Sequence, residues 1–106
     1  MEDQALNTLR RINGVSAAFV VDPTQPAPEG GVGEAQGALL GAVIAALSQA
    51  SSDLDLGAFG ETIIEAERGA VVAGALPNGR AAIVLADGKA NLGMIRMELR
   101  KLRRQS

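Results

Sequence analysis

The longest stretch of the chain without a charged residue runs from Ala35 to Ser52, between Glu34 and Asp53. On a helix its large aliphatic residues share one arc, as expected of the stripe by which a helix packs on its own domain. The opposite side holds small or uncharged polar residues, where a helix that faces water carries lysines and glutamates. We therefore expect the large stripe to face the domain and the small side to face a second polypeptide. The stripe consists of Leu39, Leu40, Val43, Ile44 and Leu47.

The small side of this helix has a regular spacing. Gly37, Gly41 and Ala45 recur every four residues, a spacing typical of helices that pack closely. A glycine inside a helix costs about 1 kcal/mol relative to alanine, so two of them favour the close approach of another backbone. The alternative is a helix buried in a larger core, and a chain of 106 residues is short for that.

The N-terminal third predicts a helix and a strand. Asp3 can cap a helix that Asn13 and Gly14 end, and its apolar residues recur at helical spacing. Residues 15–21, VSAAFVV, are apolar on both faces, which predicts a central strand covered on both sides. Residues 23–33 contain three prolines and three glycines. They cannot form a long regular element, and only a short edge strand near Gly31 to Gly33 is expected.

The C-terminal half predicts three strands and a helix. The strands are 60–67, 70–76 and 80–86, joined by turns at Arg68-Gly69 and Pro77-Asn78-Gly79. The last strand is apolar on both faces and therefore central. Asn91 caps a final helix. Its apolar side is Leu92, Ile95, Leu99 and Leu102, and its outer side carries Arg96, Arg100, Arg103 and Arg104.

Together these elements define the fold class. The order is helix, strand, short strand, helix, three strands and helix, and hairpin connections make the last three strands antiparallel. We expect one α+β domain over residues 1–106, with an antiparallel sheet sandwiched between helices. The central helix covers one face and the terminal helices cover the other.

The composition excludes several kinds of chemistry. The chain contains no Cys, His, Trp or Tyr, which removes disulfides, thiolate or imidazole metal sites and the commonest general base. The glycines before the central helix lack the Lys-Ser/Thr of a phosphate-binding loop. We expect no enzyme activity, no cofactor and no metal. The N-terminus is charged rather than apolar and the central helix is too weakly hydrophobic to span a bilayer, so a cytoplasmic protein is expected.

Charge is unevenly distributed along the chain. Residues 1–88 carry a net charge of −7 and residues 89–106 a net charge of +5. A basic helix can bind nucleic acid or anionic lipid. No aromatic residues alternate with the arginines for base stacking, however, and cations suit a helix C-terminus. We expect a solvated face, and nucleic-acid binding by residues 96–104 is the alternative.

Several runs of the chain occur in an order and spacing that can be compared with known families. They are Ile12 to Val15, Ala17 to Asp22, Ile63 to Glu65, Leu76 to Gly79 and, most specifically, Asn91-Leu92-Gly93-Met94-Ile95-Arg96. In this order and spacing they resemble the roadblock family, the small domain of roadblock-type dynein light chains and of bacterial MglB-like regulators. The family's tight turn after the first strand is replaced here by the proline-rich segment.

The resemblance implies a roadblock/profilin-like fold and a non-catalytic homodimer. It implies pairing through the central helix and the strand after it, so that two sheets become one, with the paired helices presented to a Ras-like small GTPase. A protein-complex adaptor without GTPase contact is the alternative. The implied interface residues are Gly37, Gly41, Ala42, Ala45 and Ser48 on the helix and Glu61, Ile63 and Glu65 on the strand.

Overall fold

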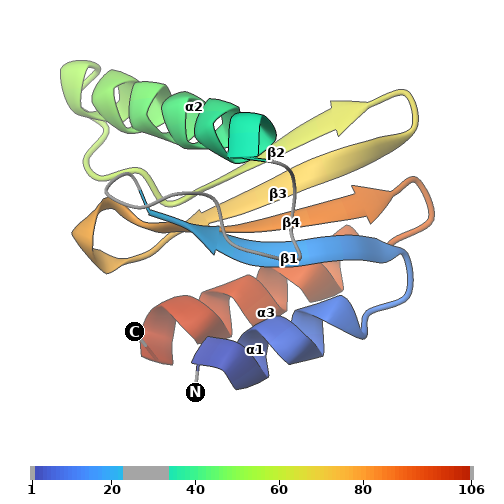
Figure 1. Cartoon of the computed structure of the whole chain (residues 1–106). Helices are drawn as coiled ribbons and strands as arrows, with labels where there is room; N and C mark the ends of the chain where they lie inside the picture. The colour runs from blue at the N-terminus through green and yellow to red at the C-terminus, as the bar shows by residue number, and fades with distance from the viewer. Residues whose placement is uncertain (1, 23–33, 106) are drawn as a thin grey trace.

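A computed structural model of the chain describes residues 2–22 and 34–105. One antiparallel sheet lies between α2 on one face and the pair α1 and α3 on the other (Figure 1). The predicted α+β sandwich is therefore confirmed. The elements are α1 (Glu2–Arg10), β1 (Val15–Val21), α2 (Glu34–Asp53), β2 (Glu61–Ala66), β3 (Gly69–Ala75), the 3-10 turn η1 (Pro77–Gly79), β4 (Ala81–Asp87) and α3 (Leu92–Gln105).

The strand order of the sheet is β1-β4-β3-β2, with every neighbouring pair antiparallel. Strand β4 is central, as predicted. Strand β1 was also predicted to be central, but within the described residues it is an edge strand. Both faces of β1 are nevertheless covered, because Ala18 and Phe19 are buried on opposite sides. An apolar sequence therefore predicts that both faces of a strand are buried, but it does not predict whether the strand is central or at the edge of the sheet. The short strand expected near Gly31 lies outside the described residues.

The turns and helix caps follow from individual residues. Asn78 and Gly79 take φ values of 67° and 77° in the β3–β4 connection, a conformation that these two residue types tolerate best. Gly14 follows α1 with φ 93°. The Asn91 side-chain oxygen accepts a hydrogen bond of 3.1 Å from the Met94 amide at the start of α3, which confirms the predicted cap. The expected cap at Asp3 is wrong, since α1 already begins at Glu2.

The larger hydrophobic core lies between the sheet and the helices α1 and α3. Four leucine and isoleucine side chains from these helices are fully buried against Ala18, Val72 and Val84. An ion pair of 3.0 Å between Arg80 and Glu2 joins the start of β4 to α1. This face of the sheet is completed by the chain itself. The four helical side chains are Leu9, Ile95, Leu99 and Leu102.

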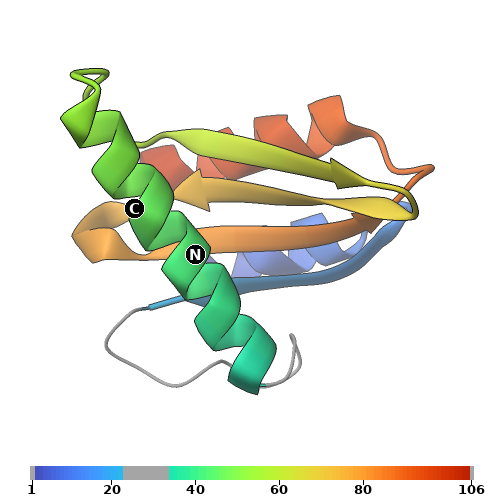
Figure 2. The ribbon, with the colours of Figure 1, turned by 90° about the horizontal axis from the view of Figure 1, so that it is seen from above.

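The opposite face of the sheet is covered less completely. Helix α2 contributes the buried Ile44 and the half-buried Leu40 to a core that includes Phe19 and Ile83. Seen from above, α2 crosses the strands obliquely and leaves the end of the sheet at the β2–β3 turn uncovered (Figure 2). As a result Ile64 is 43% exposed. None of the helices in the described part of the chain is long and apolar enough to cross a membrane.

Candidate protein interaction surface

The rotation of α2 about its axis differs from the one expected. Ile44 faces the sheet and is 7% exposed, whereas Leu39 from the same predicted stripe is 66% exposed. The expectation that the whole large stripe faces the domain is therefore wrong. These two residues lie about 140° apart on a helix with 100° per residue. The sheet contacts only the Ile44 end of that arc, which leaves Leu39 pointing outwards.

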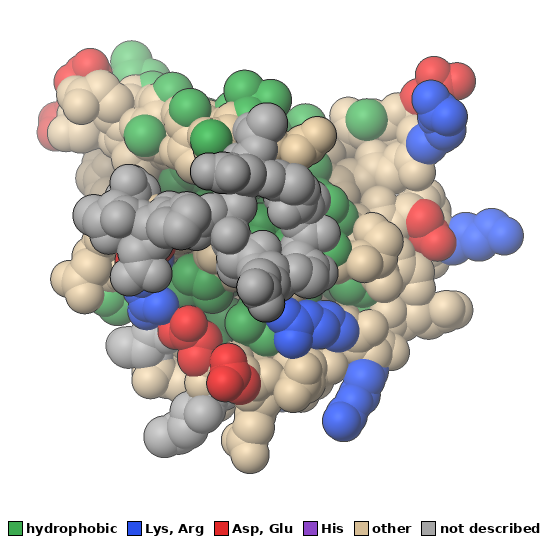
Figure 3. Space-filling model, in the orientation of Figure 1, with side chains coloured by type: hydrophobic (Ala, Val, Ile, Leu, Met, Phe, Trp, Pro, Cys, Tyr) green, Lys and Arg blue, Asp and Glu red, His purple; other side chains and the backbone are tan. Residues whose placement is uncertain are grey.

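The side of α2 that points away from the sheet is apolar and uncharged. No residue between Gln36 and Ser52 carries a charge, and Figure 3 shows hydrophobic side chains along this helix. Leu54 and Leu56, directly after α2, are also exposed. A run of exposed apolar residues on one face is typical of a surface that another protein covers. We define the outer face of α2 as the exposed residues Leu39, Ala42, Ala45, Ala46 and Gln49.

The predicted interface residues on α2 are divided between two sides of the helix. Ala42 and Ala45 belong to the outer face. Gly37 is buried and Gly41 is half-buried, and a Cβ atom built on Gly41 would have no neighbour within 4 Å. Ser48 is exposed and lines a cavity beside the sheet. Sequence reasoning missed Leu39 and Ala46, although the missing charges along α2 already marked that side as unusual.

The predicted interface residues on β2 point away from α2. Ile63 packs in the core on the α1 and α3 side, and Glu61 and Glu65 share its face because side chains alternate along a strand. The structure therefore does not bring these side chains together with Ala42 and Ala45. Strand β2 is, however, an edge strand of the sheet. Its backbone N–H and C=O groups can pair with another strand, whichever face its side chains take. The role of all eight residues at an interface remains a prediction.

Glu61 is held by two arginines of α3. Its Oε1 atom accepts hydrogen bonds from Nε and Nη2 of Arg96 at 3.0 and 2.6 Å and from Nη2 of Arg100 at 3.0 Å. The hydrogen bond from Arg96 lowers the pKa of this carboxyl below its usual value of 4.5, although burial acts in the opposite direction. Arg96 and Arg100 keep 41% and 53% of their side chains exposed, as expected of a solvated face, and their pairing with Glu61 was not predicted. Together they fasten β2 to α3.

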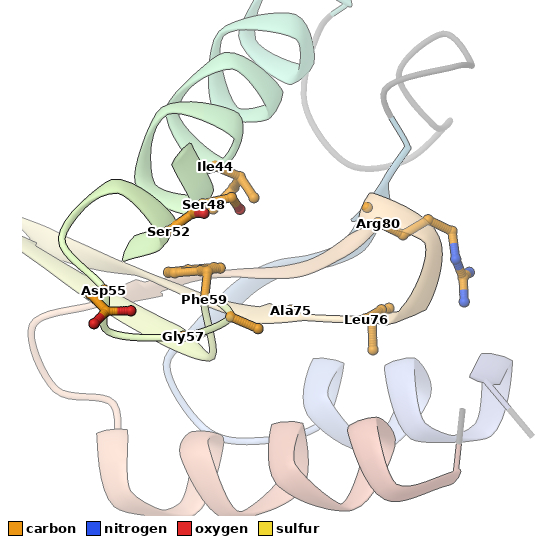
Figure 4. A pocket seen from close by; sticks show the side chains of 11 residues that line it. Ile44, Ser48, Ser52, Asp55, Gly57, Phe59, Ala75, Leu76 and Arg80 are labelled. Atoms are coloured by element: carbon orange, nitrogen blue, oxygen red, sulfur yellow. The ribbon is translucent and has the colours of Figure 1, made fainter. Parts of the chain in front are cut away.

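A cavity of about 390 Å³ lies between α2 and the sheet (Figure 4). Ser48 and Ser52 from α2 lie above Phe59, and Ile44 closes one side. Arg80 also lines the cavity, but its guanidinium extends towards Glu2 of α1. Within the residues that the structure describes, no three Asp or Glu side chains gather closely enough to hold a metal ion. The cavity therefore offers two hydroxyl groups and the Asp55 carboxylate beside the apolar Phe59 and Ile44.

Comparison with known proteins identifies solved structures that have the same fold. No family model matches the sequence, and no curated protein is similar enough in sequence to match. Among solved structures, a roadblock/LC7 domain from Streptomyces avermitilis has a TM-score of 0.75 at 15% identity, over 97% of this chain and 92% of that one. The chain has the roadblock fold, as the sequence predicted.

Within that fold, the chain is also similar in structure to MglB. MglB of Myxococcus xanthus has a TM-score of 0.82 at 17% identity, over 98% of this chain and 89% of that protein. An MglB with a tetrameric arrangement has a TM-score of 0.78 at 16% identity, over 98% of this chain and 83% of that one. At these identities the likeness establishes the fold, and function has to be argued from the surface.

Proposed function

We propose that this chain is a homodimeric regulator or scaffold for a Ras-like small GTPase. The observation that carries the proposal is the outer face of α2, which exposes Leu39 and alanines on a helix without charges. The resemblance of the sequence to the roadblock family supports the same use of this helix. Solvent is a poor environment for such a face, because about 25 cal/mol is gained for each Å² of apolar surface that leaves water.

A two-fold symmetric dimer would cover the outer face of α2 and would also pair the edge strand β2. In such a dimer the same patch on each protomer meets its own copy, so two outer faces of α2 pack together. Seen from above, the C-terminal end of α2 reaches the start of the edge strand β2 (Figure 2). Two copies of β2 can pair through their backbones and continue the sheet across the dimer. Alanines at the centre of the face allow the two helices to approach closely.

The proposed role is non-catalytic. The chain has no His or Cys, and the outer face of α2, within the described residues, carries no arginine that could reach into a partner's nucleotide site. An effect on GTP hydrolysis would then come from ordering the catalytic groups of the GTPase itself. The protein acts as a binding surface for one nucleotide state of the partner.

The test compares binding of the small GTPases of the same organism in their GDP and GTP-analogue states. The wild type is expected to bind one GTPase preferentially in the GTP-analogue state. Ala42→Glu puts a charge at the centre of the outer face and should abolish binding. Gln4→Glu, an exposed change on α1 with the same charge difference, should leave binding intact. A stable dimer that binds no GTPase in either state would instead support an adaptor role.

A further inference from the structure

Two arginines near the end of α3 have no acidic partner in the part of the chain that the structure describes. Glu61 pairs with both Arg96 and Arg100, and Glu98 pairs with Lys101 at 3.2 Å. Within the described residues Arg103 and Arg104 have no carboxylate within 4 Å. These two charges account for much of the excess positive charge at the C-terminal end of the chain. They are available to an anion from outside the domain.

Arg103 lies close to the backbone of two glycines at this end of the sheet. Its side chain runs along the ends of the strands, where its Cδ lies 3.5 Å from the position that a Cβ on Gly74 would take. Its guanidinium lies 3.6 Å from the corresponding position on Gly60. Small residues at both positions therefore leave room for this arginine.

Both arginines line an open cavity of about 590 Å³ at this end of the sheet, together with Arg100. The rest of the lining includes Phe59, Leu76 and Pro77, so cationic groups stand beside an apolar floor. Guanidinium groups bind carboxylates through paired N–H donors, while the apolar residues suit a neighbouring hydrophobic side chain. The cavity shares no residue with the outer face of α2.

We propose that this cavity binds an acidic peptide segment of a partner protein, with a carboxylate on Arg103 and Arg104 and an adjacent apolar side chain over Phe59 and Leu76. The lining favours a peptide over nucleic acid. Tight nucleic-acid binding needs many phosphate contacts, and among the described residues this cavity offers three arginines, one of them paired with Glu61, and one partly buried phenylalanine. Because the site shares no residue with the outer face of α2, a peptide partner and the proposed GTPase can bind at the same time.

The experiment selects peptides from a random twelve-residue phage library on the immobilised wild-type protein and measures the winners by fluorescence anisotropy. The expected consensus is Asp or Glu beside Leu, Ile, Phe or Met. Arg103→Gln with Arg104→Gln keeps the aliphatic stems and should weaken binding about tenfold. Arg103→Lys with Arg104→Lys keeps the charge but not the paired donors, and should give an intermediate loss.

The matched control is Arg11→Gln with Arg68→Gln. These arginines are exposed and lie outside the cavity, and their replacement changes the net charge equally. An equal loss in this control, or selected peptides without acidic residues, would overturn the proposal. So would binding of labelled DNA or anionic vesicles that depends on Arg103 and Arg104 more strongly than peptide binding does. Ala42→Glu should bind the peptides as the wild type does, which separates this proposal from the GTPase role.

Discussion

The two faces of the sheet are completed to different degrees. On the face covered by α1 and α3, four helical side chains are fully buried and ion pairs fasten both helices to the strands. On the face covered by α2, Ile44 is the one large side chain of that helix that is buried, among its residues whose burial is described (36–53), and a cavity remains beneath it. Both faces are apolar, so composition does not cause the difference. The face covered by α1 and α3 is a closely packed core, whereas the side covered by α2 exposes an apolar surface suited to a partner.

This difference predicts that the residues that stabilise the fold and the residues that bind a partner lie on opposite faces of the sheet. A domain of this size has only about 5–15 kcal/mol of net stability, and the α1 and α3 side holds most of its fully buried large side chains. Changes on that side should therefore affect folding of the single protomer. Changes on the outer face of α2 should affect assembly and leave the folding of the protomer almost unchanged.

The largest difference is expected between Leu99→Ala and Leu39→Ala. Leu99 is fully buried, and its truncation should lower the free energy of unfolding by about 3 kcal/mol because it leaves a cavity in a packed core. Leu39→Ala, made in the Ala42→Glu background to remove the dimer, should change it by less than about 0.5 kcal/mol. Guanidinium denaturation measures both. Equal costs for the two variants would contradict the division between the faces.

A smaller effect is expected for Ile44→Ala, which probes the incomplete face directly. Ile44 borders the cavity beneath α2, so neighbouring side chains can relax into the space that the substitution creates. The cost depends on how well the site collapses, and about 2 kcal/mol or less is expected, below the loss for Leu99→Ala. The same denaturation experiment measures it. A loss larger than that of Leu99→Ala would show that α2 is packed as tightly as α3.

The smallest effect is expected for Glu61→Gln, at about 1 kcal/mol near neutral pH, because the charge-assisted hydrogen bonds to α3 are weakened. The pKa of Glu61 is lowered in the folded protein. Its contribution is therefore complete above the unfolded-state value near 4.5 and is lost as the pH falls through the lower folded-state pKa.

Urea denaturation at pH 7, 4 and 3 tests this dependence. The stability difference between the wild type and Glu61→Gln should shrink as the solution becomes more acidic, since a protonated glutamate resembles glutamine. A difference that stays constant over this range would mean that the carboxylate charge contributes nothing to the attachment of β2 to α3.

Local signals in the sequence predicted most of the fold. Asn78 and Gly79 have the backbone freedom that their turn requires, and Asn91 carries the side chain that caps α3, so these boundaries depend on single residues. The burial of Leu99 follows from helical spacing with charged residues on the opposite side. Such features need no knowledge of the rest of the chain.

The parts that sequence reasoning missed depend on contacts between distant segments. The arc from Leu39 to Ile44 was wide enough for several rotations of α2, and the position of the sheet selected one of them. Likewise, the pairing of Glu61 with Arg96 joins residues 35 positions apart, and no local pattern predicts it. The absence of charge along α2 did predict an unusual surface, even though it did not tell which residues form it.

The most direct test of the central claim is the mass in solution of the wild type and of Ala42→Glu, measured by size-exclusion chromatography with light scattering. If the outer face of α2 is covered by its own copy, the wild type has twice the protomer mass of 10.8 kDa. Ala42→Glu then has the mass of a single protomer and keeps its helical circular dichroism. A wild type that remains a single protomer at about 100 µM, far above the Kd of a stable dimer, would contradict the account.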